Sequence, residues 1–286
     1  MVGMVSRAVE IATDMVPTPL ERFVEIHANR LAQVTMLVVF SFLWVPIFVL
    51  VFMSFAAGGV LSFPPEELTL EWYWQFLGND AAIRSILTTI KISPIATIIT
   101  VTLATLISYA VDRLPFPGKG VLRMLATLPI IVPLVVTGIA LVLFYGVIGF
   151  DSGYWNTVVA HVIRTIPFAT LVILPTFLTF DRELEEAAKD LGADELHTFV
   201  EITLPNVMPG IVAGGLLAFT LSFNEFVYTY FVKGSGQTTL PVYIWDQIRY
   251  NVTPEVNVIS VVFLLVAAGG ILVAVWLTRT ELIVGE

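Results

Sequence analysis

Residues 181–205, which read DRELEEAAKDLGADELHTFVEITLP, form a long polar stretch between two strongly apolar ones. Asp181 can cap a helix, and apolar residues then recur at helical spacing along one face of it. These apolar residues are Leu184, Ala187, Ala188 and Leu191. Glu185 and Lys189 stand four residues apart on the exposed side, a spacing at which opposite charges attract. The first half of the stretch therefore predicts a short amphipathic helix.

The second half of the stretch repeats this pattern after a break. Gly192 ends the first helix, and Asp194 can cap a second one. The second helix has its own apolar stripe, made of Leu196, Phe199 and Ile202. Pro205 then precedes the next apolar run. The stretch, called the 181–205 loop below, is predicted to be two short helices joined by a glycine elbow, with an apolar ridge and acidic flanks.

The composition of the whole chain is that of a membrane protein. Of 286 residues, 57% are hydrophobic and 13% are charged, whereas soluble domains have about 45–50% apolar and about 25% charged residues. The net charge of −9 disfavours nucleic acid as a partner, because phosphates attract basic surfaces. The chain has no cysteine, which excludes disulfides, thiol catalysis and cysteine metal sites.

Six apolar runs approach or exceed the roughly 20 residues that a membrane helix requires. They lie at 36–56, between Lys91 and Asp112, between Arg123 and Asp151, at 154–180, at 203–232 and between Glu255 and Arg279. The sequence predicts an all-α integral membrane protein with six transmembrane helices embedded in lipid, and the 181–205 loop joins helices four and five. Residues 1–30 are predicted to be a cytosolic lead-in, and residues 31–286 a single membrane domain.

Basic residues indicate the orientation of these helices, since they favour cytoplasmic loops. With the N-terminus inside, the inner segments hold Arg7, Arg22, Arg30, Arg113, Lys119, Arg123, Arg182, Lys189 and Arg279. The outer segments and helix ends hold Arg84, Lys91, Arg164, Lys233 and Arg249. This bias predicts that both termini and the 181–205 loop are cytoplasmic.

Within the 181–205 loop, Glu186-Ala187-Ala188 is followed after three residues by Gly192, and after nine more by Ile202-x-Leu204-Pro205. By this signature the chain resembles the permeases of binding-protein-dependent, ATP-driven importers of the type I class. The resemblance covers roughly residues 71–280.

In that family the loop forms the coupling helices that dock on an ATP-binding subunit. The resemblance assigns this role to Glu185, Glu186, Ala187, Ala188, Leu191, Gly192, Ile202, Leu204 and Pro205. It implies a prokaryotic cytoplasmic (inner) membrane, a second homologous permease, two ATP-binding subunits and an extracytoplasmic solute-binding protein. The chain has no phosphate-binding Gly-x-x-x-x-Gly-Lys-Ser/Thr loop, so ATP and Mg²⁺ are expected on the partner subunits. We expect a transport subunit rather than an enzyme, with no cofactor or metal of its own.

A narrower resemblance concerns the solute. The segments 161–167, 218–234 and 239–260 are similar to the second permease subunit of spermidine/putrescine importers. That branch has two aspartates where this chain has Asn224 and Glu225, so phosphonate, iron and thiosulfate stay open as alternative solutes. An ionised acid in a membrane segment is costly and marks a functional site by default. The predicted solute pathway is Phe223, Asn224, Glu225 and Tyr228.

Several alternatives stay open at this point. Glu225 could instead pair with Lys91, with Arg164 or with the partner permease, and His161 is expected to be a hydrogen-bonding residue at a helix end. The small residues Gly210-x-x-x-Gly214 would let two helices approach closely. The other functions considered are a scaffold that signals through the 181–205 loop, a membrane enzyme and a proton-coupled transporter. The few histidines and the few ionisable residues inside the spans disfavour the last two.

Overall fold

The computed structural model describes residues 19–58, 63–151, 153–250 and 253–284, and none of these residues forms a strand. The first helices are α2 (Pro19–Met53), α3 (Glu71–Leu77), α4 (Asp80–Arg113), α5 (Lys119–Thr127), α6 (Leu134–Ile148) and α7 (Tyr154–Thr179). The later helices are α8 (Glu183–Asp190), α9 (Glu195–His197), α10 (Leu204–Phe223), α11 (Val227–Val232), α12 (Leu240–Tyr250) and α13 (Glu255–Val284). Two further helical segments are not α-helical: η1 (Leu128–Ile130) is a 3₁₀ helix, which is tighter than an α-helix, and η2 (Thr198–Thr203) is a π-helix, which is wider.

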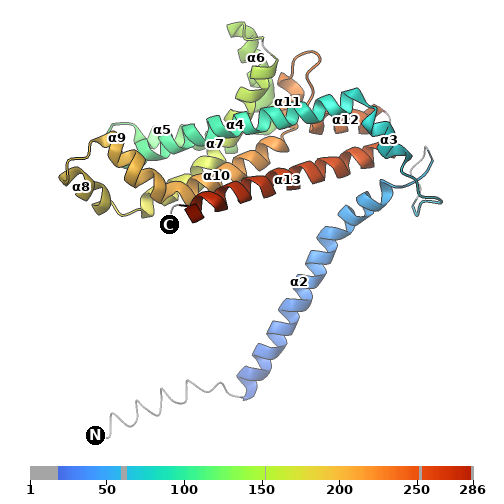
Figure 1. The fold of residues 1–286 in the computed structure, drawn as a ribbon, viewed down its shortest axis with the longest axis horizontal. Coiled ribbons are helices and arrows are strands. Elements are labelled where there is room, and N and C mark those ends of the chain that lie inside the picture. The colour runs from blue at the N-terminus through green and yellow to red at the C-terminus, as the bar shows by residue number, and fades with distance from the viewer. Residues whose placement is uncertain (1–18, 59–62, 152, 251–252, 285–286) are drawn as a thin grey trace. The chain divides into compact units, whose positions relative to one another are not determined.

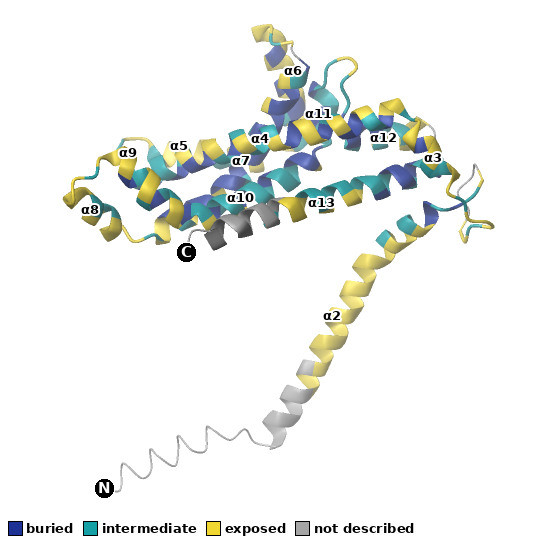
Figure 2. Cartoon of the chain, viewed as in Figure 1, coloured by how far each residue is buried: buried dark blue, intermediate teal, exposed yellow. Residues whose placement is uncertain are grey.

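Helix α2 belongs to a unit of its own, residues 1–53. From Arg30 to Met53 it is long and apolar enough to cross a membrane, and most of its apolar side chains are exposed (Figure 2). The helix begins at Pro19, so residues 19–30 of the predicted lead-in are continuous with the span. The first 18 residues, with the predicted inner residue Arg7, lie outside the described part of the chain.

The second unit, residues 54–286, is a bundle in which α4, α7, α10 and α13 run alongside one another (Figure 1). Helix α7 packs extensively against both α4 and α10, and it carries much of the core, including the fully buried Ala169, Ile173 and Phe177. The 181–205 loop lies at one end of the bundle, whereas α3 and α12 lie at the other (Figure 1). We call these the loop end and the far end.

The predicted close approach of two helices at the small residues of α10 is confirmed. Gly210 and Gly214 are buried and face α7, where a Cβ atom added to Gly210 would lie 2.3 Å from Thr176 Cγ2 and one added to Gly214 would lie 2.8 Å from Ile173 Cγ1. Ala218, one turn further on, is also fully buried. Only glycine lets the two backbones come this close.

This packing predicts that Gly210→Ala destabilises the bundle by about 1–3 kcal/mol, the usual cost of overpacking a core. The neighbouring Thr176 is β-branched, so its methyl group cannot swing away freely. Gly146→Ala in α6 is the matched control, because a Cβ atom there would meet nothing within 4 Å. The measurement is the thermal unfolding midpoint in detergent. Equal midpoints for the two variants would contradict the packing.

The prediction of a single third helix between Arg123 and Asp151 is wrong. The chain forms α5, η1 and α6 there, and the two apolar arms are bent by 108°. Pro129 lies in η1 and Pro133 precedes α6. Each proline lacks a backbone N–H and disfavours helical geometry in the residue before it, so two prolines four residues apart break the helix.

The fifth run, predicted as one helix over 203–232, is also interrupted, between α10 and α11. Two polar side chains satisfy the backbone groups at this break. Asn224 Nδ2 donates to the carbonyl oxygen of Thr220 at 2.9 Å, and the backbone N–H of Tyr228 donates to Glu225 Oε1 at 2.7 Å. The acid therefore lies in the break between two helices rather than inside one.

The number of spans agrees with the sequence. Within the described residues five helices are long and apolar enough to cross a membrane, and the bent α5–α6 pair makes a sixth if it is counted as one span. Helix α4 begins at Asp80, well before the predicted start of the second span, and α13 runs beyond the predicted end of the sixth. The all-α fold class is confirmed.

Candidate functional site

The first helix of the 181–205 loop ends as the sequence predicts, but its N-cap residue is Arg182 rather than Asp181, and Arg182 makes no side-chain capping bond. Asp181 Oδ1 accepts the backbone N–H of Glu183 at 3.0 Å. At the other end Gly192 has φ +94°, and its N–H and that of Ala193 donate to the carbonyl oxygens of Lys189 and Ala188 at 2.9 and 3.0 Å. This pair of bonds is the Schellman arrangement, which requires a left-handed residue. The glycine elbow is thus built by local hydrogen bonds.

The second predicted helix is not a separate one. Helix α9, η2 and α10 follow one another without a break, so the apolar helix runs from Glu195 to Phe223. The π-helical turn η2 lies just before Pro205, which occupies the first turn of α10. Proline has no N–H for an α-helical bond and its ring crowds the preceding turn, which explains the wider turn there. The loop therefore consists of one free helix, α8, and an elbow that leads into the fifth span.

Asp194 caps α9 as predicted. Its Oδ1 accepts the backbone N–H of His197 at 2.8 Å and lies 2.9 Å from His197 Nδ1. The hydrogen bonds from His197 lower the pKa of the Asp194 carboxyl, which favours the charged form of the cap at an exposed position.

Much of the apolar surface of the loop is open to contact. The exposed fractions are 91% for Leu191, 69% for Leu196 and 49% for Leu184. Ala187 and Glu186 are also exposed, whereas Ala188, Ile202 and Leu204 are partly buried and Pro205 is exposed. Large apolar side chains held out on a capped helix and elbow suit contact with another protein.

Glu185 faces inward, which corrects the predicted Glu185–Lys189 pair. Its carboxylate oxygens lie 3.2 and 3.0 Å from Arg113 Nε, at the end of α4, and Oε1 accepts the hydroxyl of Thr203 at 2.6 Å. Lys189 lies 3.9 Å from Glu195 instead. The Arg113–Glu185 pair forms in preference to the Glu185–Lys189 pair because Arg113 and Glu185 are both largely buried. Opposite charges attract more strongly when buried than at the surface.

A second acid joins this cluster at the end of α4. Asp112 pairs with its neighbour Arg113, and its Oδ1 accepts a hydrogen bond from Arg182 Nη2 at 2.8 Å. The Arg113 guanidinium also lies 5.5 Å from the centre of the Phe180 ring. We call Asp112, Arg113, Arg182, Glu185 and Thr203 the α4–α8 clamp. Its signal in the sequence is weak, namely an acid and a base side by side where an apolar run ends.

Glu225 pairs with Arg164, which is one of the partners considered for it from the sequence. Arg164 Nε lies 3.5 Å from Glu225 Oε2, and the two side chains are 18% and 5% exposed. The guanidinium also lies 4.9 Å from the centre of the Phe168 ring, a cation–π contact. Lys91 is exposed on α4. The pair thus joins α7 to the break between α10 and α11.

The other residues of the predicted pathway lie around this break. Phe223 is 2% exposed and stacks on Phe263 with ring centres 5.0 Å apart, and Tyr228 is fully buried. Asn224 is exposed. His161 is fully buried, and its ring nitrogens each lie 2.8 Å from a hydroxyl, those of Ser222 and Thr229. These bonds match the hydrogen-bonding role expected of His161.

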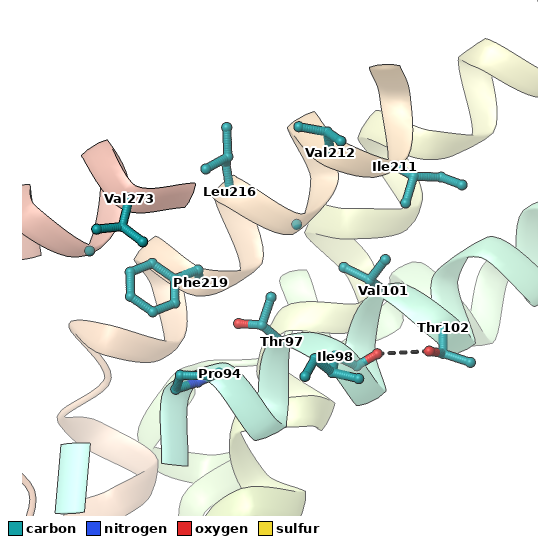
Figure 3. A pocket seen from close by; sticks show the side chains of 12 residues that line it. Pro94, Thr97, Ile98, Val101, Thr102, Ile211, Val212, Leu216, Phe219 and Val273 are labelled. Carbon is teal, nitrogen blue, oxygen red and sulfur yellow. Dashed lines mark hydrogen bonds between the residues drawn. The ribbon is translucent and has the colours of Figure 1, made fainter. Parts of the chain in front are cut away.

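An apolar groove of about 520 Å³ lies between α4, α10 and α13 (Figure 3). Its lining includes Ile98, Val101, Leu216 and Phe219, and no charged side chain is among the residues that line it. The hydroxyl of Thr102 donates to the carbonyl of Ile98 in its own helix at 2.8 Å. The apolar lining of the groove favours contact with hydrocarbon chains over contact with a polar solute. The groove is therefore not an extension of the polar site at Glu225.

The fold and the loop together define a polytopic α-helical membrane protein with a capped, exposed helix between its fourth and fifth spans. Residues 105–280 match the family described as "Binding-protein-dependent transport system inner membrane component". The chain belongs to this family, as the Glu-Ala-Ala signature predicts. It is a transport subunit and a multi-pass membrane protein.

Two relatives match most of the chain. The spermidine/putrescine transport system permease protein PotC of Haemophilus influenzae is 31% identical over 245 residues, which cover 85% of this chain and 95% of PotC. The putrescine transport system permease protein PotI of Escherichia coli is 35% identical over 238 residues, 81% of this chain and 84% of PotI. The predicted resemblance to permeases of this branch is therefore confirmed.

A solved structure shows the same fold. It is a bacterial ABC transporter involved in the import of the acidic polysaccharide alginate, and one of its chains aligns with a TM-score of 0.67 at 15% identity. The alignment covers 90% of this chain and 98% of that one. At this identity the likeness concerns the fold alone.

Proposed function

We propose that this chain is a permease subunit of an ATP-driven importer for polyamines such as spermidine and putrescine. It forms half of the translocation pathway and receives the solute from an extracytoplasmic binding protein. A second homologous permease forms the other half. Both termini and the loop end face the cytoplasm of a prokaryotic cell.

In this proposal two partner subunits bind and hydrolyse ATP with Mg²⁺. The exposed face of α8 and the elbow around Gly192 dock on one of them, through Glu186, Ala187, Leu191 and their neighbours. Closure of the ATP-binding subunits moves the 181–205 loop and turns the pathway outward, and hydrolysis resets it. The observation that carries this proposal is the loop itself, in which three exposed leucines lie along α8, the elbow and α9 beside an acidic flank.

The polyamine assignment is supported by the two relatives named above and by one acid at the break in the fifth span. Glu225 is held by Arg164, so a cationic solute would have to compete with an internal guanidinium for it. Asn224 is exposed and stands where the spermidine/putrescine branch has an aspartate. Because Glu225 is already paired, Asn224 is the position at which this departure from the two-aspartate pattern can contact the solute.

The test is energy-dependent uptake of labelled spermidine and putrescine by cells with and without the gene for this chain. We expect uptake to vanish without the chain and to return when it is restored. Unchanged polyamine uptake would overturn the solute assignment. In that case phosphonate, iron and thiosulfate uptake would be compared in the same two strains, and co-purification with an ATPase would separate an importer from a membrane scaffold.

A further inference from the structure

The α4–α8 clamp connects the 181–205 loop to a helix that runs the length of the bundle. Helix α4 has 34 residues, or about 50 Å at 1.5 Å per residue. Its last two residues hold α8 through the Arg113–Glu185 and Asp112–Arg182 pairs. Thr203 adds η2, and through it the start of α10, to the same cluster.

The other end of α4 is tied just as specifically. Asn79 caps α4 by accepting two backbone N–H groups, and its Nδ2 donates to Tyr243 of α12 at 2.9 Å and to Glu255 of α13 at 2.7 Å. Ten residues further along the chain, the buried hydroxyl of Thr89 accepts the N–H of Leu240 at 2.8 Å. Helix α4 therefore has polar ties to the far end and to the loop end.

Helix α8 has one face that packs on the bundle through the clamp and one face that is exposed. Glu185 and Glu186 are neighbours, but Glu185 is turned into the bundle and Glu186 is exposed. The buried carboxylate is already engaged by Arg113 Nε and the Thr203 hydroxyl. Glu185 thus has its partners within this chain, whereas the exposed face of α8 is left for another one.

We propose that Arg113 is the positioning residue that fixes α8 to α4, so that the 181–205 loop and α4 move as one rigid body and movement at the loop reaches the far end. This inference rests on the proposed function, since it assumes that an ATP-binding subunit moves the loop. A residue that lies between two sites does not by itself couple them, so coupling has to be demonstrated by experiment. The Arg113–Glu185 pair allows this test, because mutation can reverse the charge of either partner.

The experiment uses Arg113→Glu, Glu185→Arg and the double exchange in the assembled complex. Each single variant places like charges together at positions 113 and 185, and the double variant restores opposite charges there, although the glutamate introduced at position 113 then lies beside Asp112, which keeps Arg182 as its partner. The chain has no cysteine, so spin labels at Ala81→Cys and Asp190→Cys, two exposed positions on α4 and α8, report the distance between the helices in complexes with cysteine-free partners. Arg84→Glu is the matched control, because Arg84 lies on the same helix with its side chain 72% exposed.

In the native complex and in Arg84→Glu we expect one narrow distance distribution that Mg²⁺-ATP leaves unchanged. Each single variant should broaden it and lower the solute imported per ATP hydrolysed by about tenfold, a change of the order that mutations cause in the coupling between distant sites. The double exchange should restore most of both readouts, because it rebuilds the 113–185 pair but not the contacts of Arg113 with Asp112 and of Glu185 with Thr203. Rescue is the result that a general loss of folding would not give.

Three outcomes would overturn the inference. A native distance that changes with Mg²⁺-ATP would mean that α8 moves independently of α4. Single variants with native distances, or a double exchange that rescues only the amount of complex, would mean that Arg113 has no positioning role. The label distances do not depend on the solute, so failure of the polyamine assignment in the uptake test leaves them interpretable. Failure of the complex to contain an ATPase would overturn the proposed function instead.

Discussion

Replacing Gly192 by valine is expected to abolish most uptake while the ATP-binding subunits continue to hydrolyse ATP. Gly192 has φ +94°, and an L-residue in a left-handed conformation costs roughly 1–2 kcal/mol. That cost corresponds to a factor of about 5–30 in the population of the native elbow. A Cβ atom at this position would meet nothing within 4 Å, so the loss comes from the backbone and not from a clash.

Gly192→Asn is the matched control for this variant, because asparagine tolerates the left-handed region better than other residues. It should retain most of the uptake. The measurement is solute transported per ATP hydrolysed by the purified complex in vesicles. If valine and asparagine gave the same ratio as glycine, the elbow would have no part in coupling.

Glu186→Lys belongs to the same test but acts by another route. Its side chain is exposed on α8, so reversing its charge should leave the fold intact and weaken the contact with the ATP-binding subunit. We expect the complex to insert and to uncouple, as with Gly192→Val. Normal uptake by both variants would contradict the assignment of the 181–205 loop as the coupling element.

Breaking the Arg164–Glu225 pair is expected to have the largest effect on stability. Glu225→Gln keeps the shape of the side chain and an oxygen that can accept the Tyr228 N–H, but it leaves the Arg164 guanidinium without a counter-charge. Removing one partner of a buried ion pair costs about 3–5 kcal/mol. The amount of folded protein in the membrane and its thermal unfolding midpoint should both fall.

The double variant Glu225→Gln with Arg164→Met separates a structural role of this pair from a role in transport. It removes both charges together, and such replacements are often neutral for stability. We therefore expect it to recover most of the folded protein. Native putrescine uptake by the recovered double variant would assign the pair to structure, whereas a complex that assembles without taking up putrescine would place Glu225 in the solute pathway. A double variant no more stable than Glu225→Gln would contradict the pairing itself.

The sequence alone determined the features that depend on local chemistry. The length of an apolar run sets whether a helix can span a membrane, so the number of spans follows from composition. The cap at Asp194 and the elbow at Gly192 involve partners within a few residues, so these two features of the 181–205 loop were predictable, whereas the continuity of α9 with η2 and α10 was not.

Breaks inside spans were harder to predict, although their causes are also local. A proline in a membrane helix can kink it, break it or be accommodated by neighbours, and Pro129 and Pro133 bend the third run by 108° whereas α7 continues through Pro167 and Pro175. At Glu225 the sequence showed a charged residue in an apolar run. That it lies between α10 and α11, with its own backbone tie to Tyr228, depends on how the chain packs there.

Only the tertiary structure decided which charges meet. Glu185 had a plausible partner four residues away, but it pairs with Arg113, 72 residues distant, because the end of α4 and α8 pack together and bury both groups. Asn79 and Glu255 are 176 residues apart and join the other end of α4 to α13. Helical periodicity places a side chain on a face, but the choice of partner belongs to helix packing, where burial strengthens the attraction between the charges that it brings together.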